Sequence, residues 1–406
     1  MLLPELLAPA GDYEKLVTAY AYGADAAYVG FERYGLRAMA ANFNVDELAR
    51  ARDLAARLDR RLYLTLNAYI DSAECDVLAA DLERLRGLDF DAYIVADPGV
   101  LALVRQLDPD RSVHLSTQAN TTNLEAVRFW QQNGVARVNL ARESTLADLK
   151  AIRRGCTAEL EVFVHGAMCV AHSGRCLLSA AMTGRSANRG ACTQPCRWNY
   201  HLVEATRPHE SFPIEQDEHG TYLLNSRDLC LLEYLPELIT AGVDSLKIEG
   251  RMKSLYYVAA TVSVYRAALD SYAADPQGWS CDPRWRDELD KVSHRPYSSG
   301  FLFGRDDANI HADDSRYRRS YEFVGRVLAV DTDGRGLVEG RNRFFPGEQV
   351  ELFGPGLRHM EFTIETPYTE AGEPLTVVQP NARVMMPLPA SAAVGDLLRK
   401  AKAVSA

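Results

Sequence analysis

"ELLAPAGDYEKLVTAYAYGADAAYVG", residues 5–30, places two short apolar runs on either side of one helical segment. The runs, residues 5–10 and 26–30, have the length of buried strands, and Gly23 is placed to end the intervening helix in a left-handed conformation. A strand, a helix and a second strand in this order are typical of a parallel βα unit. The segment therefore predicts a parallel sheet covered by helices.

The same unit recurs along the chain. Asn123 is placed to cap a helix in "NLEAVRFWQQNG" (123–134), and further glycines precede later strands. No glycine-rich dinucleotide fingerprint follows the first strand, which disfavours a doubly wound sheet. We therefore predict an α/β protein with a (β/α)8 TIM-like barrel, whose function lies at the carboxyl ends of its strands. The remaining strands are expected at residues 62–69, 92–97, 112–118, 137–142, 159–166 and 244–250.

The character of the sequence changes after about residue 305. The stretch "YEFVGRVLAVDTDGRGLVEGRNRFFPGEQVELFGPG" (321–356) alternates apolar and polar residues between Gly, Asp and Pro turns. This pattern predicts a small C-terminal antiparallel β-barrel domain. The expected organisation is a catalytic barrel domain over 1–305 with a Cys-rich insertion at 167–243 after the seventh strand, a linker at 306–320 and the β domain at 321–406.

The charge balance is acidic, with 45 Lys and Arg against 55 Asp and Glu, a net charge of −10. This disfavours a protein that coats nucleic acid through its overall positive potential, but it leaves room for local basic patches. Such patches are "SRYRRS" (315–320) and "GRNRFF" (340–345), although each taken alone fits a solvated surface better. The N-terminus resembles neither a signal peptide nor a membrane span, so we expect a cytoplasmic location.

Four of the eight cysteines lie close together in "CVAHSGRCLLSAAMTGRSANRGACTQPC" (169–196). A reducing cytosol disfavours disulfides between Cys169, Cys176, Cys192 and Cys196. Their number suits either zinc or a 4Fe-4S cluster, and a position above the barrel mouth favours the cluster over a structural zinc. A thiol protease is the competing hypothesis, with Cys169 or Cys176 as nucleophile and His165 or His172 as base.

Polar residues also gather where the other predicted strands end. Arg142, Lys247 and Arg251 could hold an anionic substrate, because an arginine fork matches a carboxylate. The structural alternative is that Lys247 pairs with Glu249 inside the barrel and that Arg251 caps a helix. Asp97 precedes Pro98 and fits the start of a turn. Further polar candidates at these strand ends are Asn67, Gln118, Asn120, Asn123 and Lys253.

Several stretches resemble peptidase family U32, the collagenase-like proteins. The most specific is "ELEVFVHGAMCVAHSGRCLLS" (159–179), and "HLSTQANTTN" (114–123) and "HRPYSSGFLFG" (294–304) support it. The similarity covers the predicted barrel nearly from end to end. Within the family, "GACTQPCRWNY" (190–200) is most similar to the members that hydroxylate tRNA.

The resemblance implies an iron-sulfur enzyme that hydroxylates the wobble uridine of tRNA to 5-hydroxyuridine, with prephenate as co-substrate. The 4Fe-4S ligands that it implies are Cys169, Cys176, Cys192 and Cys196, with Cys230 as an alternative to Cys196. Zinc is the alternative cofactor. Cys75, Cys156 and Cys281 fall outside the matched motifs and are taken as ordinary.

Prephenate carries two carboxylates, so the resemblance also implies a basic pocket. If tRNA is the partner, the two arginine patches, including Arg341 and Arg343, are expected to contact phosphates. The residues expected to be catalytic are His165, Arg142, Glu249 and Arg251, and those expected to bind substrate are Asn67, Gln118, Asn120, Lys247, Arg318 and Arg319.

Other activities remain open alternatives. The family name makes a collagenase-like peptidase the second hypothesis. Hydroxylation of ribosomal RNA or of a ubiquinone precursor is a third, and a non-catalytic RNA-binding subunit is a fourth. The expected partners are tRNA and the small dicarboxylate co-substrate without a membrane, and a homo-oligomer or a related family partner is a further alternative.

Overall fold

The structure is a computed structural model that describes residues 3–35, 42–169, 172–198, 215–217, 220–222, 227–304 and 317–402. Most of the expected linker at 306–320, Arg316 included, and parts of the Cys-rich insertion lie outside the described residues. Among the described residues, no helix is both long and apolar enough to cross a membrane.

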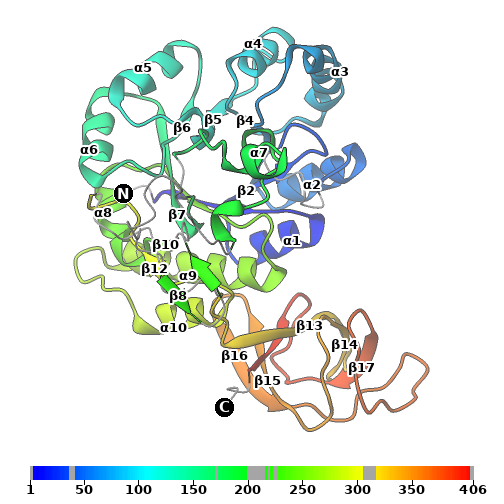
Figure 1. Ribbon diagram of the computed structural model, residues 1–406. Helices are drawn as coiled ribbons and strands as arrows, with labels where there is room; N and C mark the ends of the chain where they lie inside the picture. Colours follow the sequence, from blue (N-terminus) through cyan, green and yellow to red (C-terminus); the bar gives the residue numbers. More distant parts are fainter. Residues whose placement is uncertain are drawn as a thin grey trace.

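Eight parallel strands close into a barrel (Figure 1). The last of them pairs with the first and with the seventh, which completes the ring. This arrangement confirms the predicted (β/α)8 TIM-like fold. The barrel strands are β1 (Glu5–Pro9), β2 (Ala26–Gly30), β3 (Arg61–Leu66), β4 (Ala92–Val95), β5 (Val113–Leu115), β6 (Arg137–Asn139), β7 (Glu159–Ala167) and β11 (Ser245–Ile248).

Helices surround the barrel, and side-chain caps fix where several of them begin. Asp97 accepts hydrogen bonds from the backbone of the first turn of α4, and Asn123 does the same for α5. Both residues therefore have the structural roles that the sequence allowed. The surrounding helices are α1 (Tyr13–Ala21), α2 (Val45–Arg57), α3 (Cys75–Leu85), α4 (Pro98–Leu107), α5 (Leu124–Gln132), α6 (Leu146–Gly155), α8 (Leu235–Thr240), α9 (Leu255–Ala274) and α10 (Pro283–Lys291).

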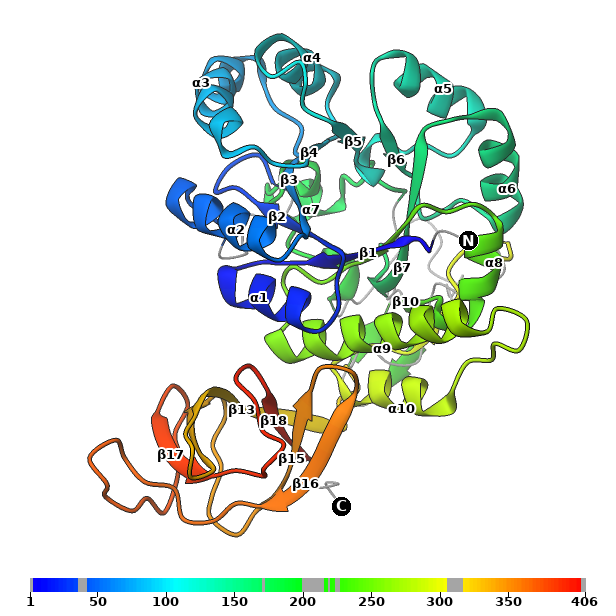
Figure 2. The same ribbon diagram turned by 180° about the vertical axis from the view of Figure 1, so that it is seen from behind.

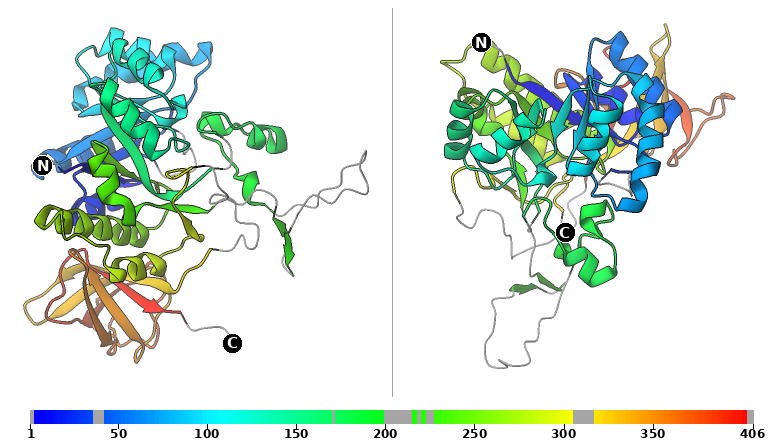
Figure 3. Two further views of the ribbon diagram at one scale, coloured as in Figure 1. Left: turned by 90° about the vertical axis from the view of Figure 1, so that its left-hand side faces the viewer. Right: turned by 90° about the horizontal axis from the view of Figure 1, so that it is seen from above.

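The segment between β7 and β11 builds structure outside the barrel. It contains α7 (Leu178–Thr183), the short hairpin of β8 (Glu215–Asp217) and β9 (Gly220–Tyr222), and β10 (Asp228–Cys230), which runs antiparallel to β7. A further strand, β12 (Tyr297–Ser298), pairs with β10. Figure 3 shows α7 standing off one side of the barrel. The insertion thus covers the carboxyl end of the barrel.

Six short 3₁₀ helices complete the described backbone of the barrel domain. Two of them, η4 (Ala187–Arg189) and η5 (Pro195–Arg197), belong to the cysteine-containing loop. The others are η1 (Ser72–Glu74), η2 (Arg86–Leu88), η3 (Thr117–Ala119) and η6 (Leu232–Tyr234).

The C-terminal residues form a separate six-stranded antiparallel sheet with its own apolar core. Buried and more exposed residues alternate along residues 335–340 and 383–387, so one face of each of these two strands packs into that core. Its strands are β13 (Tyr321–Val330), β14 (Arg335–Gly340), β15 (Gln349–Gly354), β16 (Arg358–Thr363), β17 (Arg383–Pro387) and β18 (Leu397–Ala401).

A buried arginine fastens this domain to the barrel helices. Arg399 on β18 is fully buried and forms ion pairs with Glu288 of α10 and, at 2.8 Å, with Glu351 of β15. Its guanidinium also donates to the Tyr256 hydroxyl of α9 at 2.9 Å. Figure 2 shows the domain against α9 and α10. The buried ionic contact indicates that the two domains form one packed unit.

Arg341 belongs to the same interface. Its guanidinium pairs with Glu14 of α1 and, at 2.7 Å, with Glu339 of β14. Arg343, in contrast, is exposed and donates to the Gln379 amide at 3.3 Å. Two carboxylates thus pair with Arg341 between the domains, which disfavours the expectation that it contacts phosphate and leaves Arg343 as the exposed arginine of "GRNRFF".

Candidate functional site

A cavity of about 290 Å³ lies at the carboxyl end of the barrel. Residues from six barrel strands or the loops that follow them meet residues of the cysteine loop around it, as the TIM-like fold requires for a site. Its lining includes Tyr28, Thr65, Asn67, Ser116, Gln118, Asn139, Arg142, Phe163, Cys169, His172, Cys176, Asn188, Cys192, Cys196, Lys247, Glu249 and Arg251.

Lys247 forms the floor of this cavity. Its ammonium group lies 2.7 Å from a carboxylate oxygen of Glu161 and 4.5 Å from the centre of the Tyr28 ring. Lys247 is buried, so this pairing offsets the cost of removing its charge from water. The sequence suggested Glu249 as the partner of Lys247 inside the barrel, but the structure pairs Lys247 with Glu161, which was not among the predicted site residues.

Arg251 is held in place between glycines. Its guanidinium donates to the Thr65 hydroxyl at 3.0 Å and to the Asn42 amide oxygen at 2.5 Å. A side chain at Gly30 would collide with that guanidinium, and one at Gly11 would collide with the Arg251 carbonyl. These close approaches fix the arginine at the wall of the cavity, and its head points across the barrel rather than capping a helix.

Arg142 connects the barrel to the cysteine loop. One guanidinium nitrogen lies 3.9 Å from the Cys169 sulfur, and another lies 3.7 Å from a Glu249 carboxylate oxygen. The guanidinium carbon lies 4.0 Å from the centre of the Phe163 ring, which orients the group by a cation–π contact. Arg142 thus presents positive charge both to the cavity and to a cysteine.

The four clustered cysteines all line this cavity. Cys169 is exposed and the other three are half-buried, and all four are free thiols. The Gln194 backbone N–H points at the Cys192 sulfur at 3.4 Å. No three His, Cys, Asp or Glu side chains in the described part of the chain converge as a ready metal site. The donor set nevertheless fits a four-cysteine group in type and number, with N–H donors that favour thiolates.

Cys230 lies elsewhere. It is buried on β10, with its sulfur 4.0 Å from the Tyr265 hydroxyl, and burial raises the pKa of its thiol. It does not line the cavity that Cys196 shares with the other clustered cysteines. The structure therefore does not bring Cys230 to the place where a fourth ligand would be needed.

His165 is also turned away from the cavity. Its ring lies among those of Tyr257, Tyr265 and Tyr297, at centroid distances of 5.9, 5.6 and 5.3 Å. Burial lowers the pKa of His165 to about 3, so the ring is neutral near pH 7. This position does not support the predicted catalytic contact with a substrate.

The second histidine considered as a base is His172. It lines the cavity, and its Nδ1 atom lies 3.7 Å from a Glu143 carboxylate oxygen. Among the described residues, no hydrogen bond joins His172 to a cysteine sulfur. Within the part of the chain that the structure describes, the cavity therefore shows no cysteine in hydrogen-bond contact with a histidine.

The expected polar substrate-binding residues divide into two groups. Asn67 and Gln118 line the cavity, and the Asn67 amide donates to the Ser116 hydroxyl at 3.1 Å. Asn120 adopts a left-handed conformation (φ 52°) after a 3₁₀ turn and is not part of the lining. Arg318 and Arg319 are exposed and lie outside this cavity.

The comparisons with known proteins agree with the signature around the cysteines. The model of peptidase family U32 matches residues 11–312, and the model of the U32 C-terminal domain matches residues 319–399. The chain belongs to peptidase family U32. The boundary between the two family models falls between the barrel domain and the C-terminal sheet.

Three curated U32 relatives illustrate the similarity. "tRNA hydroxylation protein P1" of Bacillus subtilis (strain 168) is 40% identical over 98% of this chain and 95% of its own length. "tRNA hydroxylation protein P" of Escherichia coli (strain K12) is 36% identical over 96% of this chain and 94% of its own. "23S rRNA 5-hydroxycytidine C2501 synthase" of Escherichia coli (strain K12) is 37% identical over 66% of this chain and 39% of its own.

The U32 cavity also contains residues that the sequence analysis missed. Asn139 ends β6 and lines the cavity, and its buried Oδ1 atom has no hydrogen-bond partner among the described residues. Asn188 lines the cavity from the cysteine loop, where it accepts a hydrogen bond from the Cys176 backbone at 3.4 Å. The signal for Asn139 was its place in "RVNLAR" at the end of a predicted strand.

Proposed function

We propose that this U32 protein is an RNA-modifying enzyme that hydroxylates tRNA. The observation that carries the proposal is the cavity in which four cysteines meet Arg142, Lys247 and Arg251. The names of the relatives that align with nearly the whole chain support it, since they describe tRNA hydroxylation. The specific reaction that we propose is conversion of the wobble uridine to 5-hydroxyuridine with prephenate as co-substrate.

The cysteine loop is the proposed holder of a 4Fe-4S cluster, with Cys169, Cys176, Cys192 and Cys196 as ligands. When bound, such a cluster supplies electron transfer. Two N–H donors could stabilise the negative charge of cysteine thiolates, because Arg142 and the Gln194 backbone N–H both point at cysteine sulfurs. Hydrogen bonds of this kind stabilise thiolate ligands and tune the potential of the group that they hold.

The cationic residues are the proposed binding site for the carboxylates of the co-substrate. Three cations, Arg142, Lys247 and Arg251, line the cavity against one lining carboxylate, Glu249. Glu161 pairs with Lys247 from below at 2.7 Å and also lies 3.5 Å from Arg137. Cations that line a cavity favour an anionic co-substrate, and a guanidinium group matches the planar geometry of a carboxylate.

The chemistry of the reaction also requires a co-substrate. Hydroxylation at C5 replaces a C–H bond of the uracil ring with a C–OH bond, which adds one oxygen atom and oxidises the base by two electrons. Transfer of an oxygen atom from a hydroxylated co-substrate balances both changes, because the donor is reduced by the same two electrons. The side chains of the cavity bind and orient the co-substrate beside the cysteines.

Metal analysis of anaerobically purified protein tests the cofactor. We expect about four irons and four sulfides per chain and visible absorption in the wild type, and loss of all three in Cys176→Ala. Cys75→Ala is the matched control, because Cys75 is half-buried on α3 and lies outside the cavity. A colourless protein with stoichiometric zinc, or a Cys176→Ala variant with full iron content, would refute the iron-sulfur assignment.

Nucleoside analysis tests the reaction. Total tRNA from a strain that lacks this gene, and any redundant hydroxylation route, should contain no 5-hydroxyuridine derivatives. Complementation with the wild type and with Cys75→Ala should restore them, and complementation with Cys176→Ala should not. Undiminished 5-hydroxyuridine in the deletion strain would rule out tRNA hydroxylation. If the deletion strain instead lacks a ribosomal RNA modification, ribosomal RNA is the substrate.

The family name keeps peptidase activity as the competing function. Release of peptides from gelatin by the pure protein, abolished in Cys169→Ala or Cys176→Ala, would favour it. We expect no release, because His172 makes no hydrogen bond with a cysteine sulfur among the described residues and His165 is buried. The same preparations used for iron analysis can serve for this assay.

A further inference from the structure

A second cavity, of about 380 Å³, lies beside the first. The two share Cys169, Cys192, Cys196 and Glu249 in their linings. The cysteine loop therefore separates two compartments, and cysteine side chains border both. The second cavity is called the outer cavity below, and its volume is in the range of small-molecule sites.

The outer cavity differs from the first in its chemistry. Its walls include the thioethers of Met168 and Met252 and the ring of Tyr317, whereas the three cations of the first cavity are absent from its lining. Met252 and Tyr317 are 48% and 43% exposed, so both present side-chain surface at the edge of the cavity. Flat, apolar and polarisable walls suit an uncharged aromatic ring better than a carboxylate.

One cation, Lys253, organises the edge of the outer cavity. Its ammonium group donates to the Ser293 carbonyl at 3.0 Å and lies 4.4 Å from the centre of the Tyr317 ring. It also lies 5.2 Å from the centre of the Tyr257 ring. These contacts hold Tyr317 at the cavity and place a positive charge at its edge.

Two more cations follow directly in the chain. The backbone of Arg318 is fixed against His294 by reciprocal hydrogen bonds of 3.0 and 2.7 Å, so its position relative to the barrel is set. The side chains of Arg318 and Arg319 are exposed, and neither has an ion-pair partner among the described residues. An aromatic wall beside solvated arginines is the combination that proteins use to bind single-stranded nucleic acid.

We propose that the outer cavity receives the target pyrimidine base of RNA, flipped out of its stack and packed against Tyr317 and Met252. Arg318 and Arg319 bind the flanking phosphates. This inference rests on the proposed function and adds to it a division of labour, in which the anionic co-substrate and the base approach the cysteines from separate cavities. An enzyme that modifies a ring atom must extrude the base or use an unpaired one, and the base then needs a pocket.

RNA binding by full-length, anaerobically purified protein tests the inference. The probes are an anticodon stem-loop with uridine at the wobble position and the same stem-loop with an abasic site there. We expect wild type to bind the uridine probe more tightly, by roughly 5- to 150-fold, which is the affinity that stacking of one base contributes. Tyr317→Ala should remove this difference, and Tyr317→Phe should keep it because the ring remains.

Two further variants serve as an independent test of the outer cavity and as a control. Met252→Gln changes an exposed side chain of the same cavity and should reduce the preference for uridine even if Tyr317→Ala does not fold. Phe129→Ala removes a comparably exposed ring on α5, away from both cavities, and should change nothing. Iron content and the far-ultraviolet circular dichroism spectrum identify variants that fold normally.

The outcomes separate this inference from the proposed function. If wild type binds both probes equally, or if folded Tyr317→Ala and Met252→Gln keep the full preference, the outer cavity is not the base site. The proposed function then still stands if the deletion strain lacks 5-hydroxyuridine. If wild type binds neither probe and the tRNA nucleosides of the deletion strain are unchanged, the proposed function fails and this inference fails with it.

Discussion

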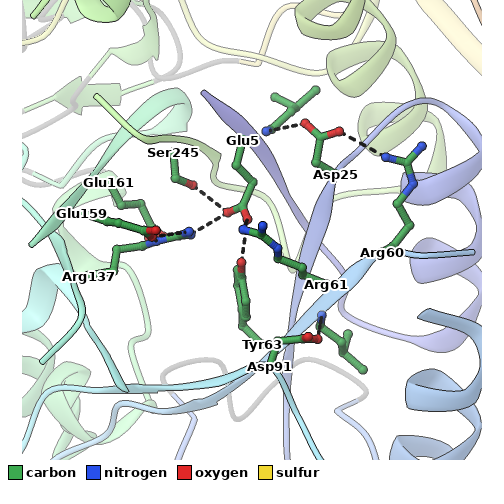
Figure 4. Close-up of polar contacts among 12 residues, drawn as sticks. Glu5, Asp25, Arg60, Arg61, Tyr63, Asp91, Arg137, Glu159, Glu161 and Ser245 are labelled. Atoms are coloured by element: carbon green, nitrogen blue, oxygen red, sulfur yellow. Dashed lines mark hydrogen bonds and ion pairs between the residues drawn. The ribbon is translucent and has the colours of Figure 1, made fainter. Parts of the chain in front are cut away.

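The two ends of the barrel interior both contain buried charges, but they arrange them differently. At the amino-terminal end, Glu5 accepts hydrogen bonds from Arg137 at 2.5 Å, Tyr63 at 2.6 Å and Ser245 at 3.0 Å (Figure 4). Arg61 adds an ion pair to the same carboxylate at 3.0 Å. These residues begin β1, β3, β6 and β11 or follow closely, so the network closes the barrel at that end.

At the carboxyl end the charges surround a cavity. Arg142 lies at a loose 3.7 Å from Glu249, and Arg251 contacts neutral oxygens of Thr65 and Asn42. A closed network whose charges satisfy one another has a structural role, because removal of one partner is costly, whereas cations that border a cavity can bind an anion. The difference teaches that burial of a charge does not by itself mark a functional residue. What marks it is an accessible space beside the charge.

The largest effect should come from breaking the closed network. Arg137→Met leaves Glu5 buried without its main counter-charge, and loss of one partner of a buried pair typically costs about 3–5 kcal/mol. We expect this loss in the free energy of unfolding measured with urea, with the iron content of the folded protein unchanged. Arg128→Gln, on an exposed pair of α5, is the matched control and should cost less than about 1 kcal/mol.

The double variant Glu5→Gln with Arg137→Met tests the reason for that loss. If the cost arises from an uncompensated carboxylate, removal of its charge should recover part of the stability. A loss below about 1 kcal/mol in Arg137→Met would mean that Arg61 alone compensates Glu5. The closed end would then be less tightly coupled than its hydrogen bonds indicate.

The open end should respond in the opposite way. Arg142→Gln removes a cation that borders the cavity, so we expect affinity for the dicarboxylate co-substrate to fall by about 10- to 100-fold, as for a lost charged hydrogen bond. Titration of prephenate into the anaerobic protein measures this. Stability should change by less than about 1 kcal/mol. Unchanged affinity together with a large loss of stability would place Arg142 with the structural charges instead.

Much of the barrel could be predicted because its signal is local and repeated. Short apolar runs, helix-ending glycines and capping residues such as Asn123 lie within a few residues of one another in the chain. The cysteines were equally visible, because one continuous segment contains all four. The strands β10 and β12, in contrast, form by pairing with segments that are distant in the sequence, so no local sequence pattern predicts them.

His165 shows why the rest could not be predicted. Strict alternation along β7 would point it to the same side as Glu161 and Phe163. The pairing with β11 shifts, however, since Lys247 faces Phe163 and Ile248 faces His165, which inserts one extra residue in β7. Such a bulge re-aims the side chains that follow it. His165 therefore contacts Tyr265 of α9 instead of the cavity.

The buried position of His165 predicts a pH effect on stability. The pKa of a histidine in the unfolded chain is about 6.5, and burial lowers that of His165 to about 3. Between these values the unfolded state binds the additional proton, so stability is full above pH 6.5 and falls as the pH decreases, by up to about 1.4 kcal/mol per pH unit. We expect a loss of about 2 kcal/mol between pH 6.5 and pH 5.

Urea unfolding of His165→Gln across the same pH range isolates this contribution. The variant should lose stability less steeply on acidification than the wild type, whatever its stability at neutral pH. His359→Gln is the control, because His359 is exposed on β16. Equal slopes in the wild type and His165→Gln would show that other buried histidines, such as His114, whose pKa burial also lowers, account for the acid sensitivity.

The smallest effect extends the comparison to the surface, where Arg341 is neutralised and Arg318 and Arg319 are not. Arg341 is enclosed by Glu14 and Glu339, so Arg341→Gln should leave RNA affinity unchanged. Arg318→Gln and Arg319→Gln should each reduce the slope of log affinity against log salt by about 1, the value for one lost phosphate contact. Measurement of tRNA affinity across a series of salt concentrations gives the slope for each of the three variants. If all three variants reduce the slope equally, the ion pairs of Arg341 do not prevent it from contacting RNA. The presence or absence of an ion-pair partner would then not distinguish structural from functional arginines in this protein.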